Sequence, residues 1–160
     1  MSELTGAAIL RQLLNVLREA LDGSSGPWSY FIDNRPGGGL FGALAPLSAA
    51  EASRPWGDTT IAAHVHHVAF AMEVSAASIE GDDTHRDWDQ SWRVTTVDEA
   101  GWTQLISRLR REYERLRQAV GSRAAASEDA FGGAVGVIAH VAYHLGSIRQ
   151  KIVALRADQS

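Results

Sequence analysis

The chain of 160 residues contains no cysteine. This excludes disulfide bonds, thiolate metal ligands and a cysteine nucleophile supplied by the protein itself. The first residues carry Glu3 and no basic segment before an apolar block, so we expect no signal peptide and a cytoplasmic protein. The longest uncharged apolar stretch, residues 131–148, is interrupted by four glycines and falls just short of a membrane span, so we expect no membrane partner.

Lysine is also scarce, since Lys151 is the only one, and 15 basic residues against 19 acidic ones give a formal net charge of −4. The one arginine-rich segment, residues 108–117, also contains Glu112 and Glu114, which is typical of a solvated helix face. Without a basic stripe with interleaved aromatic residues, the sequence does not predict nucleic-acid binding. The glycines at 37–39 are not followed by the Lys-Ser/Thr of a phosphate-binding loop, and no HExxH protease motif occurs.

A hydrophobic fraction of 45% over this length is typical of one globular domain, which we assign to residues 1–160. Apolar residues recur at three- and four-residue spacing in four long segments, and no segment has the alternation of a strand. The fold class predicted is therefore all-α, as a four-helix bundle. The four predicted helices cover residues 4–21, 60–80, 96–120 and 128–155.

Two connections between these helices are long. Residues 24–58 include Trp28, Tyr30, Phe31 and Phe41, so they form either a pocket wall or a loop that only covers the core. A capping box at 48–51 predicts a short helix within this loop. The polar connector 81–95 contains Trp88 and Trp92, which indicates that it packs onto the bundle. Its length lets it cross the bundle, so the second and third helices are predicted to run parallel.

The termini of the third helix carry sequence signals of their own. Thr96 and Glu99 have the spacing of a capping box, so we expect Thr96 to be the N-cap. Gly121 is expected to end the helix.

Histidines gather in two of the predicted helices. His140 and His144 are four residues apart, which places both rings on one helix face, one turn apart. On the second helix, His67 falls beside the apolar arc with His64 as its neighbour, whereas His66 falls on the solvent side. Either these rings bind one metal ion, or the spacing is a coincidence and each ring forms hydrogen bonds elsewhere.

The types of ligand limit the metals that such a site would hold. Neutral imidazoles suit zinc, nickel, iron or copper better than magnesium or calcium. Three protein ligands leave an open position, which a catalytic metal needs and a structural zinc site lacks. The sequence thus leaves two alternatives, which are a metal-dependent enzyme and a non-catalytic bundle in which the ion only holds two helices together.

The segments 60–68 (Thr-Ile-Ala-Ala-His-Val-His-His-Val) and 140–150 (His-Val-Ala-Tyr-His-Leu-Gly-Ser-Ile-Arg-Gln) resemble the DinB/YfiT-like family of four-helix metalloenzymes. The resemblance covers most of the chain and implies His67, His140 and His144 as ligands of a divalent metal, with zinc or nickel preferred. It also implies an up-down-down-up bundle with a long loop between the first two helices, often as a homodimer. Tyr143 and Ser147 depart from the family pattern, in which many members have His and Gln.

Relatives in that family include thiol-dependent S-transferases and isomerases. The resemblance therefore implies a thiol-dependent transferase or a hydrolase acting on a small molecule, with a low-molecular-weight thiol as possible partner. His64 and Tyr143 are the candidate catalytic neighbours of the metal. We expect the substrate to lie between the metal and the aromatic side chains of the loop 24–58.

Overall fold

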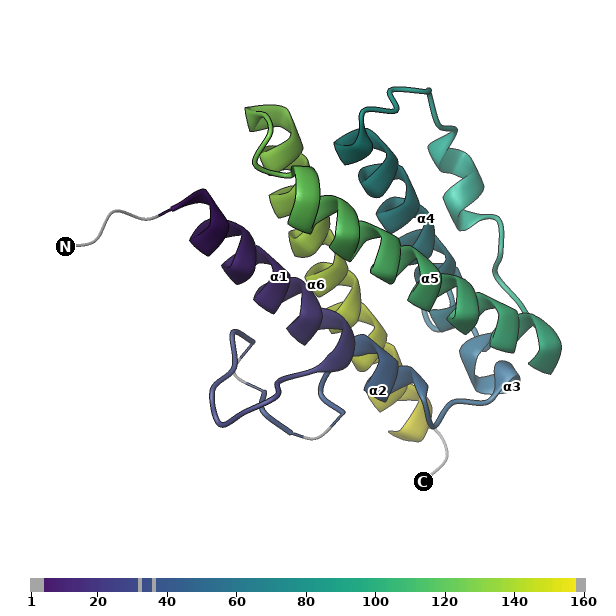
Figure 1. The fold of residues 1–160 in the computed structure, drawn as a ribbon. Coiled ribbons are helices and arrows are strands. Elements are labelled where there is room, and N and C mark those ends of the chain that lie inside the picture. The colour runs from purple at the N-terminus through teal and green to yellow at the C-terminus, as the bar shows by residue number, and fades with distance from the viewer. Residues whose placement is uncertain (1–4, 32, 36, 158–160) are drawn as a thin grey trace.

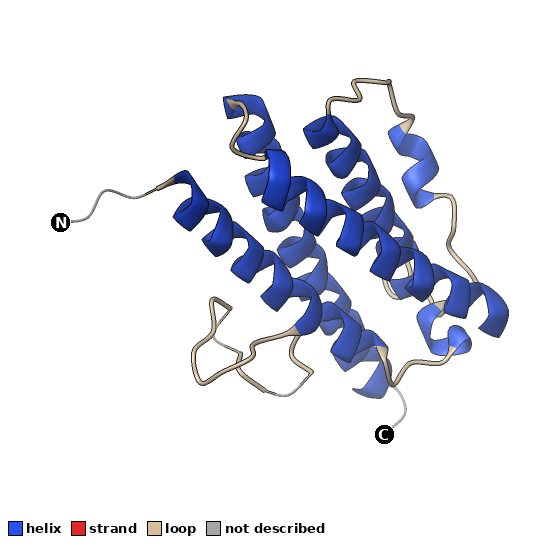
Figure 2. Ribbon diagram, viewed as in Figure 1, coloured by secondary structure: helices blue, strands red, loops and turns tan. Residues whose placement is uncertain are grey.

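A computed structural model describes residues 5–31, 33–35 and 37–157 (Figure 1). Helices dominate this part of the chain and no strand forms in it (Figure 2). The all-α prediction is therefore confirmed. Four long helices form the bundle: α1 (Gly6–Asp22), α4 (Ile61–Glu80), α5 (Glu99–Arg123) and α6 (Glu128–Ala157). The short helices are α2 (Leu40–Leu44), α3 (Ala49–Ala52) and the 3₁₀ helix η1 (Trp88–Trp92).

The helix N-termini follow local capping chemistry. Thr5 caps α1, and residue 4, where we predicted its start, lies outside the described residues. Of the two threonines that precede α4, Thr59 and Thr60, it is Thr60 that caps the helix, and its Oγ1 accepts a hydrogen bond from the backbone N–H of Ala63 at 3.1 Å. The predicted capping box Ser48–Glu51 is present at α3. Each cap satisfies N–H groups that have no partner within the helix.

The prediction for the ends of α5 was wrong at both termini. Asp98, and not Thr96, is the N-cap, and its carboxylate accepts a hydrogen bond from the N–H of Gly101 at 2.7 Å. Glu99 is not engaged in a capping box, because its carboxylate accepts from the N–H of Ala49 in α3. Gly121 does not end the helix, which continues to Arg123.

α4 and α5 run parallel, as the connector length predicted (Figure 1). Where α4 begins, the Thr60 hydroxyl donates to the carbonyl of Thr95, just before α5. Where α4 ends, Glu80 forms an ion pair with Arg115, and its carbonyl accepts from Arg123 near the end of α5. Both helices therefore begin at one end of the bundle and finish at the other.

α6 packs against both α1 and α4. Among the described helices, only α6 is long and apolar enough to cross a membrane by length and composition. The core helix of a soluble protein meets the same criteria, so this property alone does not place α6 in a membrane. The core side of α6 carries Val141, Leu145 and Ile148, and His144 lies buried on it.

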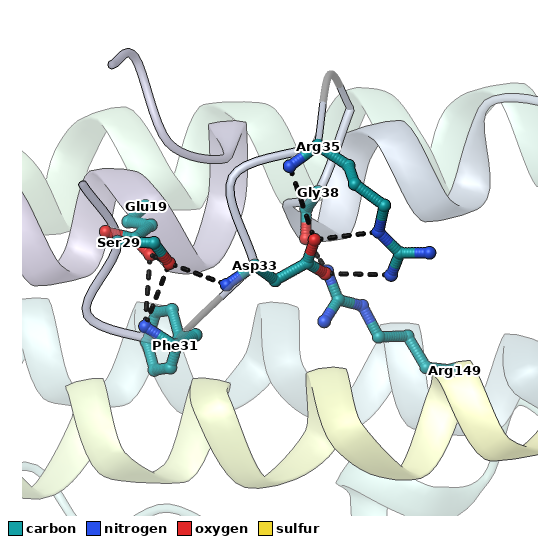
Figure 3. A network of polar contacts seen from close by, with 7 residues as sticks. All are labelled: Glu19, Ser29, Phe31, Asp33, Arg35, Gly38 and Arg149. Atoms are coloured by element: carbon teal, nitrogen blue, oxygen red, sulfur yellow. Dashed lines mark hydrogen bonds and ion pairs between the residues drawn. The ribbon is translucent and has the colours of Figure 1, made fainter. Parts of the chain in front are cut away.

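The loop after α1 is anchored by the carboxylate of Glu19, which is buried (Figure 3). Its oxygens accept hydrogen bonds from the Ser29 hydroxyl and from the backbone N–H groups of Tyr30 and Phe31. Burial opposes ionisation, but these hydrogen bonds outweigh it and lower the pKa of Glu19. Glu19 therefore fixes the loop to α1.

A second anchor joins the same loop to α6. Asp33 lies between Arg35 and Arg149, with Nε of Arg35 and an Nη of Arg149 each 2.8 Å from its carboxylate (Figure 3). Hydrogen bonds from Arg35, and then from Arg149, hold the pKa of Asp33 well below its usual range. Arg149 also donates to the carbonyl of Gly38. The loop is thus held to α1 and α6 by charged groups.

Candidate metal centre

The three predicted ligands meet between α4 and α6. One ring nitrogen of each of His67, His140 and His144 lies within 4.8 Å of the other two. His67 and His144 are buried and His140 is half-buried. The Nε2 atoms of His67 and His140 are 3.0 Å apart. The sequence-based grouping of these residues is therefore confirmed as a set of side chains close enough to hold a metal ion.

The distances suit a transition metal. An ion that binds each nitrogen at about 2.0–2.1 Å holds two tetrahedral ligands about 3.3 Å apart. The separation of 3.0 Å between the Nε2 atoms of His67 and His140 differs from that by a few tenths of an ångström. No carboxylate or thiolate belongs to this group in the part of the chain that the structure describes. Three nitrogen donors fit zinc, nickel, copper or iron rather than magnesium or calcium.

The connector between α4 and α5 covers this group, which the sequence did not specify. The ring of Trp92 stacks on His67, with centroids 4.1 Å apart and an angle of 17° between the planes. Ser91 is fully buried, and its Oγ lies 2.7 Å from Nδ1 of His67. The spacing of Trp88 and Trp92 signalled that this segment packs down, but it did not indicate where.

The neighbouring histidines have different roles from one another. His64 is buried, and its Nδ1 lies 2.8 Å from Nδ1 of His144, so it is the polar neighbour that we predicted. Its Nε2 is buried without a hydrogen-bond partner. The prediction that His66 is solvated was wrong: it is half-buried, and its Nδ1 lies 2.8 Å from the carbonyl of Ser91. Tyr143 is exposed and contacts the ring of His144 with its edge.

Burial keeps the three rings of the group, and that of His64 beside them, neutral. Desolvation, with a smaller effect from neighbouring histidines, lowers the pKa of His67 to about 4 and that of His144 to about 3. Desolvation, and then the positive charge of Lys151, lowers the pKa of His64 to about 4. Desolvation also lowers the pKa of His140. Neutral imidazole is the form that binds a metal, so the site is in its ligand form at neutral pH.

A hollow of about 300 Å³ lies beside His140. No charged side chain lines this hollow, and two of its lining residues are glycines of α6. The lining residues are Ala71, Ser75, Trp88, Gly133, Gly136, Val137 and His140. One of the three ligands is thus reached from a surface hollow, although His67 and His144 are buried.

The aromatic residues of the loop 24–58 do not surround the histidines, contrary to our expectation. Trp28 and Tyr30 contact each other, and the hydroxyl of Tyr30 donates to Gln12 of α1. Phe41 packs on Tyr113 of α5. Two tryptophans that contact His67, Trp88 and Trp92, come instead from η1, because the connector returns along α4 to reach the start of α5.

Comparison of the chain with protein-family models, with curated proteins and with solved structures returned no match.

Proposed function

We propose that this protein binds one divalent transition metal ion, zinc or nickel, through His67, His140 and His144. The observation that carries the proposal is the convergence of three neutral ring nitrogens from two helices within 4.8 Å. Their neutrality at pH 7 supports it, because a protonated ring has no free electron pair for a metal. The absence of a carboxylate from the group favours these metals over magnesium.

We further propose that the centre is catalytic and acts on a small molecule. A bound metal with an open position would activate water or a thiol as a nucleophile. The hollow beside His140 supports an open position, since it brings solvent-accessible space to a ligand. The chain has no cysteine, so a thiol would come from a low-molecular-weight partner. The reaction class proposed is thiol-dependent S-transfer or hydrolysis.

The residues around the ligands have separable roles in this proposal. His64 shares a hydrogen bond with His144 and so orients that ring. Tyr143 is exposed and its ring contacts that of His144, so its side chain is available to a substrate that approaches along α6. We therefore retain His64 as a positioning residue and Tyr143 as a candidate for contact with substrate.

The wider assignment is also a proposal. The ligand positions on α4 and α6, and the parallel course of α4 and α5, support a DinB-like bundle of up-down-down-up order. Exposed apolar side chains on α6, among them Phe131, Val135 and Val153, support a homodimer. A cytoplasmic location is proposed as well, and the net charge of −4 disfavours binding to nucleic acid or to an anionic membrane surface.

One observation favours a second function. His67 and His144 are buried, and Trp92 covers one ring of the group. A fully enclosed ion would only hold α4 and α6 together, as structural metal sites do. X-ray absorption spectroscopy of the zinc-loaded protein separates the two functions. A water ligand beside three histidines supports the enzyme, and a closed shell of protein ligands supports the structural bundle.

Metal analysis of the purified protein tests the site itself. We expect one equivalent of divalent metal in the wild type and less than one tenth of that in His140→Ala and His144→Ala. His85→Ala is the matched control, because His85 is exposed and outside the group. His66→Ala should also keep its metal. Unchanged metal content in either ligand variant would refute the assignment.

A screen of electrophiles with low-molecular-weight thiols tests the reaction. Metal-loaded wild type should turn over at least one electrophile or hydrolysable substrate, and His144→Ala should not. If the metal-loaded protein turns over none, and its coordination shell is closed, the structural function replaces the catalytic one.

A further inference from the structure

The connector between α4 and α5 contacts the candidate metal centre through one hydroxyl group. Ser91 is fully buried, and its Oγ has two close neighbours. The carbonyl oxygen of Trp88 lies at 2.6 Å, and Nδ1 of His67 lies at 2.7 Å. Both distances are those of hydrogen bonds.

The proton of Ser91 can serve only one of these neighbours, because a hydroxyl carries a single hydrogen. A carbonyl oxygen only accepts, and two oxygens 2.6 Å apart repel each other unless a proton lies between them. The Ser91 hydroxyl therefore donates to Trp88, and its Oγ accepts from Nδ1–H of His67. A neutral imidazole holds one proton, so Nε2 of His67 keeps a free electron pair.

That free electron pair lies on the nitrogen the metal centre needs. Nε2 of His67 is the atom 3.0 Å from Nε2 of His140. If His67 carried its proton on Nε2 instead, the ring would have to lose it or rotate before it could bind an ion. Ligating histidines commonly donate their second N–H to an oxygen that fixes the tautomer and orientation of the ring.

The position of Ser91 is itself fixed by two neighbouring contacts. Its carbonyl oxygen lies 2.8 Å from Nδ1 of His66, which must be the donor because a carbonyl only accepts. The next residue, Trp92, stacks on the ring of His67. The connector therefore contacts two successive histidines of α4 and restrains the rotation of His67.

We propose that Ser91 is a positioning residue that holds His67 as the Nδ1–H tautomer, with Nε2 presented to the metal. This inference rests on the proposed metal site. It makes metal affinity depend on η1, a short helix that supplies no ligand. Removal of the Ser91 hydroxyl should lower affinity for Zn²⁺ about 10- to 100-fold, the range observed when such supporting groups are removed.

Two measurements on the full chain test the proposal. The first is ¹⁵N NMR of the histidine rings in the metal-free wild type, where His67 should show a protonated Nδ1 and an unprotonated Nε2. The second is calorimetric titration with Zn²⁺ alone for the wild type and for Ser91→Ala. The substitution should weaken binding about 10- to 100-fold, and the NMR spectrum of the variant should show a mixture of both His67 tautomers.

Ser53→Ala is the matched control. The Ser53 hydroxyl also donates to a carbonyl, that of Val97, and accepts from an N–H, but it is not in the histidine group. We expect its Zn²⁺ affinity to be that of the wild type.

The possible outcomes separate this inference from the proposed function. If wild-type His67 is protonated on Nε2, the inference is wrong, whether or not Ser91→Ala folds. If wild type and Ser91→Ala bind Zn²⁺ equally, the inference is also wrong and the metal site stands. If the wild type binds neither Zn²⁺ nor another divalent metal, the proposed function fails, while the NMR spectrum still decides the tautomer.

Discussion

Two long connections cover this bundle, and their polar groups serve different purposes. The loop 24–58 is held by two carboxylates: Glu19 of α1 accepts hydrogen bonds from loop N–H groups, and Asp33 of the loop pairs with Arg149 of α6. In the connector 81–95, the hydroxyl and carbonyl of Ser91 contact the rings of His67 and His66. The first connection holds its own loop in place, whereas the second supports side chains of the candidate site.

Glycines of the loop 24–58 and of α6 also differ in whether the fold requires them. A Cβ added to Gly39 would lie 2.3 Å from the backbone nitrogen of Gly23, so the close approach of two segments requires glycine there. A Cβ added to Gly133 or Gly136 would meet nothing within 4 Å. Glycine within a helix costs about 0.5–1 kcal/mol relative to alanine. The fold does not require these two glycines, and both line the hollow beside His140.

The largest effect that we predict is that of acid on the metal-free protein. The pKa values of His64 and His67 are lowered to about 4 and that of His144 to about 3, against 6.5 for an ordinary His. Between pH 6.5 and about 4 the unfolded chain therefore binds protons that the folded protein does not. The free energy of unfolding should fall with pH in this window, by about 1.4 kcal/mol per pH unit for each such His.

Denaturant unfolding at several pH values measures this effect. The carboxylates of Glu19 and Asp33 contribute mainly below about pH 5, because their pKa values are lowered in the folded protein while the unfolded carboxylates take up protons near their ordinary pKa values of 4.5 and 3.8. Saturating Zn²⁺ should raise the stability at each pH without removing its pH dependence, since the metal-bound rings stay unprotonated while the unfolded chain still takes up protons. A metal-free protein equally stable at pH 7 and pH 5 would contradict the burial of neutral rings.

The next largest effect concerns the loop anchor. Glu19→Ala should lower the free energy of unfolding by about 3 kcal/mol, because it leaves the Ser29 hydroxyl and the N–H of Tyr30 without their acceptor and removes one of the two acceptors of the Phe31 N–H. Zn²⁺ stoichiometry should not change. Loss of metal from a folded Glu19→Ala protein would show that the two connections are not independent.

Trp92→Ala tests the other connection, residues 81–95, at its contact with the candidate site. It removes the ring stacked on His67, and we expect Zn²⁺ to bind with about tenfold lower affinity and unchanged stoichiometry. Trp28→Ala is the control, because the ring of Trp28 contacts that of Tyr30 in the loop 24–58. Equal calorimetric affinities for the two variants would remove the distinction between the regions.

The smallest predicted effect is a gain in stability. Gly136→Ala should raise the free energy of unfolding by about 0.5–1 kcal/mol, because helix propensity improves and the new methyl group meets no atom. Gly39→Ala should lower it, since backbone atoms would have to move. Thermal unfolding of both variants measures the difference. A destabilised Gly136→Ala protein would show that this glycine has a structural role.

The sequence predicted local features well where the signal is itself local. The apolar spacing located the four long helices, and Ser48 was recognised as a cap because its partner, Glu51, lies three residues away. The N-terminus of α5 was predicted wrongly because the contact that engages Glu99 is not local. The carboxylate of Glu99 accepts from Ala49, a residue 50 positions away, and local spacing carries no information about that contact.

The metal-ligand set was predictable because helix geometry is regular. A spacing of four residues places His140 and His144 on one face, and the apolar arc of α4 shows which way His67 points. Packing changes neither of these two inferences, since each depends on the geometry of a single helix. Only their meeting within 4.8 Å required the tertiary structure.

By itself, the sequence determined the helices, their buried faces and the side chains suited to bind a metal, because hydrophobic periodicity and side-chain chemistry are properties of single segments. The tertiary structure decided which connection covers the histidines. Both connections contain aromatic and polar residues, but only residues 81–95 must return along α4 to reach the start of a parallel α5. That course brings Ser91 and Trp92 to His67.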